Sequence, residues 1–134
     1  MQVDGSCHCG RITYKAVVDP ARASVCHCTD CQALSGGPYR VSVPAEAANF
    51  QLLTGKPKGY VKTAESGAKR LQAFCGDCGS PIYATSPEDQ KLYTLRVGLL
   101  RQRAQLAPKR QIWKRSAMPW SADLGALPAV ERQT

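Results

Sequence analysis

Seven cysteines in three short clusters are the residues of this chain with the most distinctive chemistry. They lie in the sequences CHC, CHCTDC and CGDC, as Cys7, Cys9, Cys26, Cys28, Cys31, Cys75 and Cys78. Cysteines one or two residues apart chelate a metal well, because a tight turn brings both sulfurs to about 2.3 Å from one ion, whereas a disulfide needs a specific Cβ geometry. An odd cysteine count without a visible secretory signal also argues against a disulfide framework. The clusters therefore predict metal sites in a reducing, cytoplasmic environment.

Zinc is the metal that such thiolate-rich sites favour, and an iron–sulfur cluster is the alternative. Seven sulfurs divide into one closed site of four and one site of three. We expect Cys7 and Cys9 to join Cys75 and Cys78 in the closed structural site. Closing the long loop between them costs free energy that grows only logarithmically with its length, whereas structural zinc returns roughly 10 kcal/mol or more. The prediction is two zinc ions per chain, the second held by the middle cluster.

The middle cluster, Cys26, Cys28 and Cys31, is the candidate reactive site. With three protein ligands, its zinc keeps a vacant fourth position, which is where zinc does chemistry. The alternative is that both sites are structural and that His8, His27 or a water molecule completes the second. Each histidine stands between two cysteines, and its ring is expected to point away from the metal that its neighbours bind. We therefore predict that neither histidine is a ligand.

Alternation of apolar and polar residues predicts half-buried strands at Arg11–Val17 and Tyr93–Val97. Shorter strands are expected at residues 39–43, 50–53, 59–63, 69–74, 81–85 and 111–114. One short helix is expected at Asp30–Leu34, with Thr29 as its N-cap and Gly36–Gly37 ending it. The first cysteine pair should precede the first strand. The sequence predicts a mainly β fold of short antiparallel strands with one short helix, as a single zinc-binding domain over residues 1–134.

Net charge is concentrated late in the chain. The 134 residues carry a formal charge of +8 and are 43% apolar, which fits one soluble domain; no apolar stretch approaches the roughly 18 residues of a membrane span. Residues 90–122 hold no acid and eight basic residues, namely Lys91, Arg96, Arg101, Arg103, Lys109, Arg110, Lys114 and Arg115. Such a segment attracts an anion, either a small carboxylate or a phosphate backbone. The alternative is a solvated positive face.

Five segments together resemble the glutathione-dependent formaldehyde-activating enzyme family. They are GSCHCGRITYKA, CHCTDCQ, FCGDCGSPIY, LYTLRVGLL and IWKRSAMPW, and the resemblance runs from Gly5 to about Pro128. It implies an Mss4-like zinc-bound β fold. It also implies a structural zinc on the first and last cysteine clusters and a reactive zinc on the middle one, which is the division that ligand counting predicts.

The resemblance implies condensation of glutathione with formaldehyde to S-hydroxymethylglutathione, formally the reverse of a carbon–sulfur lyase reaction. A zinc ion with three thiolates is a weak Lewis acid, so we expect it to bind an incoming thiol as thiolate. The partners are then a small-molecule thiol, glutathione, and formaldehyde or another small aldehyde. A homo-oligomer is compatible with the sequence, and no membrane partner is expected.

Two other classes of function remain as hypotheses. One is a non-catalytic protein that binds glutathione or another thiol. The other is a zinc-stabilised module that binds nucleic acid or protein, and its support is the net charge alone. The cysteine spacing gives no compact zinc finger, and the expected helix is too short for a recognition helix. We therefore do not expect nucleic acid as a partner.

Overall fold

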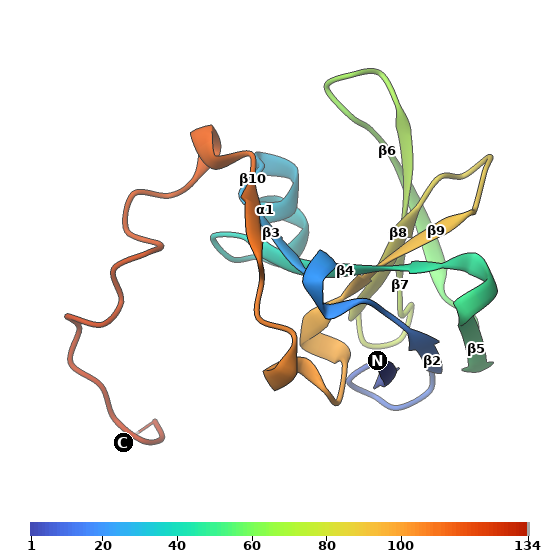
Figure 1. Ribbon diagram of the computed structural model, residues 1–134, viewed down its shortest axis with the longest axis horizontal. Coiled ribbons are helices and arrows are strands. Elements are labelled where there is room, and N and C mark those ends of the chain that lie inside the picture. The colour runs from blue at the N-terminus through green and yellow to red at the C-terminus, as the bar shows by residue number, and fades with distance from the viewer. Residues whose placement is uncertain (134) are drawn as a thin grey trace.

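Ten strands form two sheets in the computed structural model, which describes residues 1–133 (Figure 1). They are β1 (Gln2–Ser6), β2 (Thr13–Val17), β3 (Ser24–Cys26), β4 (Arg40–Glu46), β5 (Phe50–Thr54), β6 (Lys58–Thr63), β7 (Lys69–Phe74), β8 (Pro81–Thr85), β9 (Leu92–Arg96) and β10 (Arg110–Ile112). The smaller sheet has the order β1-β2-β5, and the larger has the order β10-β3-β4-β9-β8-β7-β6. One α-helix, α1 (Thr29–Ser35), occurs among the described residues. The mainly β prediction is confirmed.

Two short strands and one pairing direction depart from the expectation. β1 and β3 were not predicted, because each is short and contains a single large aliphatic residue, Val3 in β1 and Val25 in β3. Since β1 precedes it, the first cysteine pair lies between β1 and β2 and not before the first strand. β10 pairs with β3 in parallel, whereas the other strand pairs are antiparallel. The larger sheet is therefore mixed.

Strand β4 continues through Pro44, where the sequence suggested an end. β3 pairs only with Arg40 to Ser42, and from Val43 onward β4 pairs with β9 alone. Proline cannot donate a hydrogen bond to a neighbouring strand, so it is tolerated where one side of the strand has no partner. The strand therefore reaches Glu46. Arg40 and Ser42 lie on the same face of β4, and β9 is the neighbouring strand.

The hydrophobic core takes residues from both sheets. Tyr14 of β2, Ile82 of β8 and Leu95 of β9 are fully buried in one cluster. Alternation along each strand places these side chains on the inner face and leaves the opposite face of the larger sheet for other contacts. No helix among residues 1–133 combines the length and hydropathy of a membrane span.

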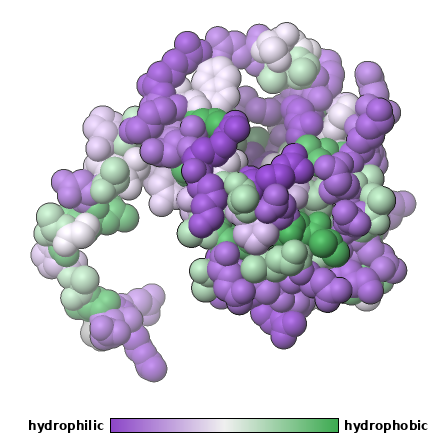
Figure 2. All heavy atoms as spheres, viewed as in Figure 1, coloured by the Kyte–Doolittle hydropathy of each residue, from purple (hydrophilic) through white to green (hydrophobic). Residues whose placement is uncertain are grey.

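The C-terminal segment after Ala117 projects from the body in Figure 1. Within the described chain, the last residue of the core cluster is Leu106. Leu124, Leu127 and Val130 are exposed, and Figure 2 shows hydrophobic side chains along this projecting segment beside a body whose visible face is largely hydrophilic. The metal-ligating candidates thus all belong to the body.

Gly5 is a point at which the core permits no side chain. A Cβ at this position would overlap the ring of Tyr14, which is completely buried. We expect Gly5→Ala to lower the free energy of unfolding by about 1–3 kcal/mol through overpacking. Urea unfolding followed by circular dichroism measures this change. Gly98→Ala is the matched control, because a Cβ there meets no atom within 4 Å; equal stabilities of the two variants would contradict the prediction.

Candidate functional site

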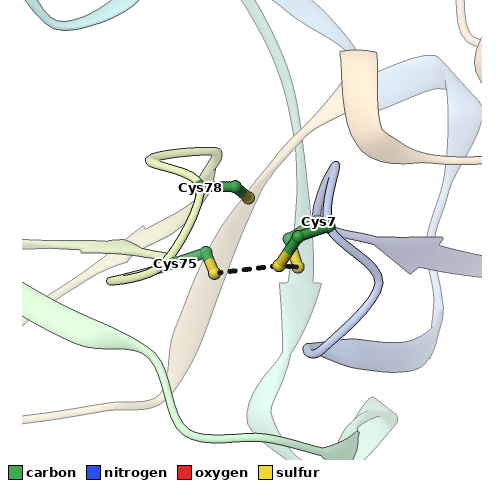
Figure 3. A group of neighbouring side chains, drawn as sticks. Cys7, Cys75 and Cys78 are labelled. Carbon is green, nitrogen blue, oxygen red and sulfur yellow. Dashed lines mark hydrogen bonds between the residues drawn. The ribbon is translucent and has the colours of Figure 1, made fainter.

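The first and last cysteine clusters meet in space. Cys7 and Cys9 lie in the loop between β1 and β2, and Cys75 and Cys78 in the loop between β7 and β8. All four sulfur atoms lie within 4.8 Å of one another. The Cys7 and Cys9 Sγ atoms are 3.6 Å apart, and those of Cys9 and Cys75 are 3.8 Å apart. Figure 3 shows the thiols of Cys7, Cys75 and Cys78 pointing toward a common centre.

Glycines and backbone amides shape both loops around the sulfurs. Gly10 and Gly79 each follow the second cysteine of a pair, and both have positive φ, 83° and 82°. A residue with a Cβ rarely adopts this conformation. The turn also aims the Ile12 N–H at the Cys7 Sγ, at 3.3 Å, which stabilises a thiolate there.

The residues of this first group fit a zinc ion. A tetrahedron with zinc–sulfur bonds of about 2.3 Å has edges of about 3.8 Å, and the sulfur separations of 3.6 Å and 3.8 Å match it. A disulfide, with sulfurs about 2.05 Å apart, is absent, and all seven cysteines are free thiols. A hydrogen bond from the Ser80 hydroxyl lowers the pKa of Cys78 to about 5, so this ligand is ready as a thiolate at neutral pH.

The middle cluster converges where β3 leads into α1. Cys26 ends β3, Cys28 is the N-cap of α1 and Cys31 lies in its first turn. The three sulfurs lie within 4.8 Å of one another. The expected N-cap, Thr29, was wrong: the Cys28 Sγ accepts the hydrogen bond from the Cys31 N–H at 3.2 Å. A cysteine thus does the work that sequence rules assign to a hydroxyl or carboxylate residue.

Neither histidine joins either cysteine group among the described residues. His27 is buried, and its Nε2 lies 2.8 Å from the Gln111 Oε1, a bond that ties the end of β3 to β10. His8 is exposed on the first loop. The middle group therefore consists of three sulfurs, the donor set that suits zinc with one position left for an external ligand.

Two buried arginines, which the sequence analysis did not single out for this site, lie beside the middle cluster. Strand register sets Arg40 opposite Cys26 and Arg96 opposite Ser42, so these four side chains share one face of the larger sheet. The Arg40 Nη2 lies 3.6 Å from the Cys31 Sγ. Both guanidinium groups also donate to the Gln72 Oε1, Arg40 at 3.4 Å and Arg96 at 2.8 Å.

This arrangement corrects one part of the charge analysis. Arg96 was counted in the positive segment, but its side chain is only 7% exposed and it donates to the Ser42 hydroxyl at 2.8 Å. The other seven basic residues of that segment are exposed. Arg96 therefore belongs to the interior of the candidate site and adds nothing to a surface that attracts anions.

Electrostatics separate the three thiols. The hydrogen bond from Cys26, together with the positive charge of Arg40, lowers the pKa of Cys31 to about 5, and the same shared proton raises the pKa of Cys26. Burial lowers the pKa of Arg96 to about 9, with a contribution from the charge of Arg40. Neither arginine forms an ion pair with a carboxylate of residues 1–133. The negative charge next to Arg40 is the Cys31 thiolate, whose sulfur lies 3.6 Å from the Arg40 Nη2.

Two cavities lie near the middle cluster, one with Cys28 in its lining and one linked to the cluster by Arg40, which contacts Cys31. One, of about 360 Å³, reaches Cys28 and is lined by polar and charged residues, among them Lys62, Trp113 and Arg115. The other, of about 290 Å³, has Arg40 and Arg96 in its lining together with Leu34, Tyr60, Phe74 and Tyr83.

Trp113 has the only positive φ of a non-glycine residue in the described chain, at 56°, and its ring stacks under Arg115. Strained backbone of this kind clusters at functional sites.

Comparisons with known proteins agree with this description. The chain is 25% identical to an uncharacterized lyase of Schizosaccharomyces pombe over 101 residues, which is 75% of this chain and 69% of the lyase. A crystal structure of a Rhodobacter sphaeroides protein shares the fold, with a TM-score of 0.62 at 18% identity, covering 81% of this chain and 98% of the other. Residues 2–116 match the family described as glutathione-dependent formaldehyde-activating enzyme, so the chain belongs to that family.

Proposed function

We propose that this protein joins glutathione to a small aldehyde at the middle cysteine cluster. The observation that carries the proposal is the convergence of three thiols, with no fourth side-chain ligand from residues 1–133, at the wall of a cavity large enough for a small molecule. Cys26, Cys28 and Cys31 would hold zinc there, and the bound zinc supplies a position in which an external thiol is kept as thiolate. Cys7, Cys9, Cys75 and Cys78 would hold the structural zinc.

The cavity beside Cys28 suits the charge pattern of glutathione, which carries two carboxylates and one ammonium. The Lys62 Nζ pairs with the Asp30 Oδ2 at 2.9 Å, and the Arg115 Nη2 with the Glu65 Oε2 at 3.4 Å. In the bound state the two cations pair with the ligand carboxylates, and one of the two acids pairs with its ammonium. This charge complement supports glutathione over an uncharged thiol.

Arg40 has the role of stabilising the reacting groups. Its guanidinium lies against the Cys31 sulfur, so it stands next to any thiolate and carbonyl held at the cluster. Attack of the glutathione sulfur on the aldehyde carbon forms the carbon–sulfur bond and moves the carbonyl electron pair to oxygen, which then takes a proton from solvent. A buried cation facing that oxygen favours this step, and holding both reactants together supplies the rest.

Exchange spectroscopy by nuclear magnetic resonance on a mixture of glutathione and formaldehyde tests the proposal. We expect substoichiometric zinc-loaded protein to accelerate formation and breakdown of the adduct. Lys62→Met should weaken the apparent affinity for glutathione several-fold, because it removes a charge-assisted hydrogen bond, whereas Lys56→Met, on an exposed loop outside the cavity, should not. Stoichiometric glutathione binding with exchange at the buffer rate would overturn the proposal in favour of non-catalytic thiol binding.

A further inference from the structure

The cavity lined by Arg40 and Arg96 is too large for formaldehyde. Its volume of about 290 Å³ equals that of about ten water molecules in the liquid, whereas formaldehyde has two non-hydrogen atoms. Its walls are mainly the carbon atoms of Leu34, Tyr60, Phe74 and Tyr83. An apolar molecule of several carbons removes more of this surface from water than formaldehyde does and gains binding free energy in proportion.

The two buried arginines that line this cavity carry N–H groups without a hydrogen-bond acceptor among the described residues. Both are 7% exposed, and neither the Arg40 Nε nor the Arg96 Nε has a hydrogen-bond partner among residues 1–133. Within residues 1–133, the only side-chain oxygens that their guanidinium groups reach are those of Gln72 and Ser42, which are neutral. The Cys31 thiolate offsets part of the charge of Arg40, but its sulfur meets only the Arg40 Nη2, at 3.6 Å. The two Nε–H groups still lack an acceptor, which is costly for buried cations unless an anion or a strong acceptor meets them.

We propose that this cavity binds the apolar chain of the aldehyde, so that the preferred aldehyde is larger than formaldehyde and its oxygen accepts hydrogen bonds from Arg40 and Arg96. The inference rests on the proposed function and names the substrate class of the same site. The thiol approaches from the cavity beside Cys28, and the aldehyde lies on the Arg40 side of the cluster.

The reaction balances without a further reactant. The glutathione sulfur, having lost its proton to solvent, forms a bond to the aldehyde carbon, and the carbonyl π bond breaks. Its electron pair moves to the oxygen that faces the arginines, and solvent returns one proton to that oxygen. The product is a hydroxyalkyl thioether of glutathione, and no atom is oxidised or reduced.

Two aldehydes test the inference on the zinc-loaded protein. We expect the protein to accelerate adduct exchange of glutathione with hexanal as well as with formaldehyde, with a higher kcat/KM for hexanal. Acceleration with formaldehyde alone would overturn this inference and leave the proposed function standing. Acceleration with neither would overturn the proposed function itself.

A binding measurement supplies a readout that does not depend on turnover. Hexanoate carries the same chain with an inert carboxylate, and we expect calorimetry to show that it binds at least tenfold more tightly than 1-hexanol. Arg96→Met keeps the aliphatic part of the side chain and removes a buried charge, so it should fold and should weaken hexanoate binding about tenfold.

A variant pair on the cavity wall guards against an indirect effect of the charge change. Leu34→Trp adds bulk at the cavity from α1 and should also weaken hexanoate binding. Val61→Ala is the matched control, because Val61 follows Tyr60 on β6 but is exposed and lies outside the cavity lining. Hexanoate binding that is unchanged in both Arg96→Met and Leu34→Trp would overturn the inference.

Discussion

The variant Cys75→Ser is expected to lose its cooperative unfolding transition and to bind one zinc ion fewer than the natural protein. Cys75 is 1% exposed, and its sulfur lies 3.8 Å from that of Cys9 across the contact between the two loops. Apparent binding free energies of structural zinc reach about 10–16 kcal/mol in small peptides, whereas a whole domain is stable by about 5–15 kcal/mol. Removing one ligand of the four therefore lowers the free energy of unfolding by an amount comparable with the stability of the whole domain.

Cys28→Ser is the matched control for this result. It removes one ligand of the middle cluster, but serine is itself a favoured N-cap residue, so α1 keeps its cap. We expect this variant to unfold cooperatively with one zinc ion per chain. Thermal unfolding by circular dichroism and metal analysis of the purified proteins measure both quantities. If Cys75→Ser retained two zinc ions and the stability of the natural protein, the structural assignment of the first group would be wrong.

The cysteine groups could be predicted from sequence because the information is local. Spacing within each cluster limits which sulfurs chelate together, and counting seven ligands divides them into four and three. The structure brings together both predicted groups, Cys7 with Cys9, Cys75 and Cys78, and Cys26 with Cys28 and Cys31. Their occupation by zinc stays a prediction, supported by the sulfur separations in the first group.

The arginine pair could not be predicted because it depends on strand register. Arg40 and Arg96 are 56 positions apart, and the charge pattern placed Arg96 in a surface segment. Only the pairing of β4 with β3 and β9 brings both guanidinium groups to the face that carries Cys26. One feature of the sequence indicated on which face of the sheet Arg96 lies. Arg96 is two positions after Thr94 in the alternating run of β9, so its side chain lies on the face opposite to that of the buried Leu95.

Local chemistry also explains the two errors near the cysteines. β1 has one apolar side chain in the core and gains its pairing from β2, whose alternation is clear, so propensity alone did not predict it. The N-cap of α1 was assigned to Thr29 because hydroxyl side chains usually fill that position, but Cys28 precedes it and its sulfur accepts the amide hydrogen bond. A metal-ligating residue thus also fixes the start of the helix.

The variant Cys31→Ser is expected to reduce glutathione and formaldehyde exchange to the rate in buffer while the protein stays folded. Cys31 is the thiol that Arg40 contacts, and its replacement removes one of three zinc ligands together with the negative charge that faces the buried guanidinium group. We expect loss of the more exchangeable zinc ion and of measurable glutathione binding. Ser35→Ala, on the exposed end of the same helix, should keep both.

The pH dependence of Cys31 alkylation tests the electrostatic basis of this result. With only the more exchangeable zinc of the middle cluster removed, by brief treatment with a weak chelator that leaves the structural zinc and the fold in place, a thiol whose pKa is about 5 is almost fully ionised above about pH 6. Its rate with iodoacetamide should therefore be nearly constant between about pH 6 and pH 8. An ordinary thiol, with a pKa near 8.5, gains close to tenfold per pH unit over that range. Arg40→Met removes the neighbouring charge and should raise the pKa of Cys31, which restores part of that slope. Site-resolved mass spectrometry separates Cys31 from the other cysteines, and a tenfold rise per unit at Cys31 in the natural protein would show that Arg40 and Cys26 do not hold it as a thiolate.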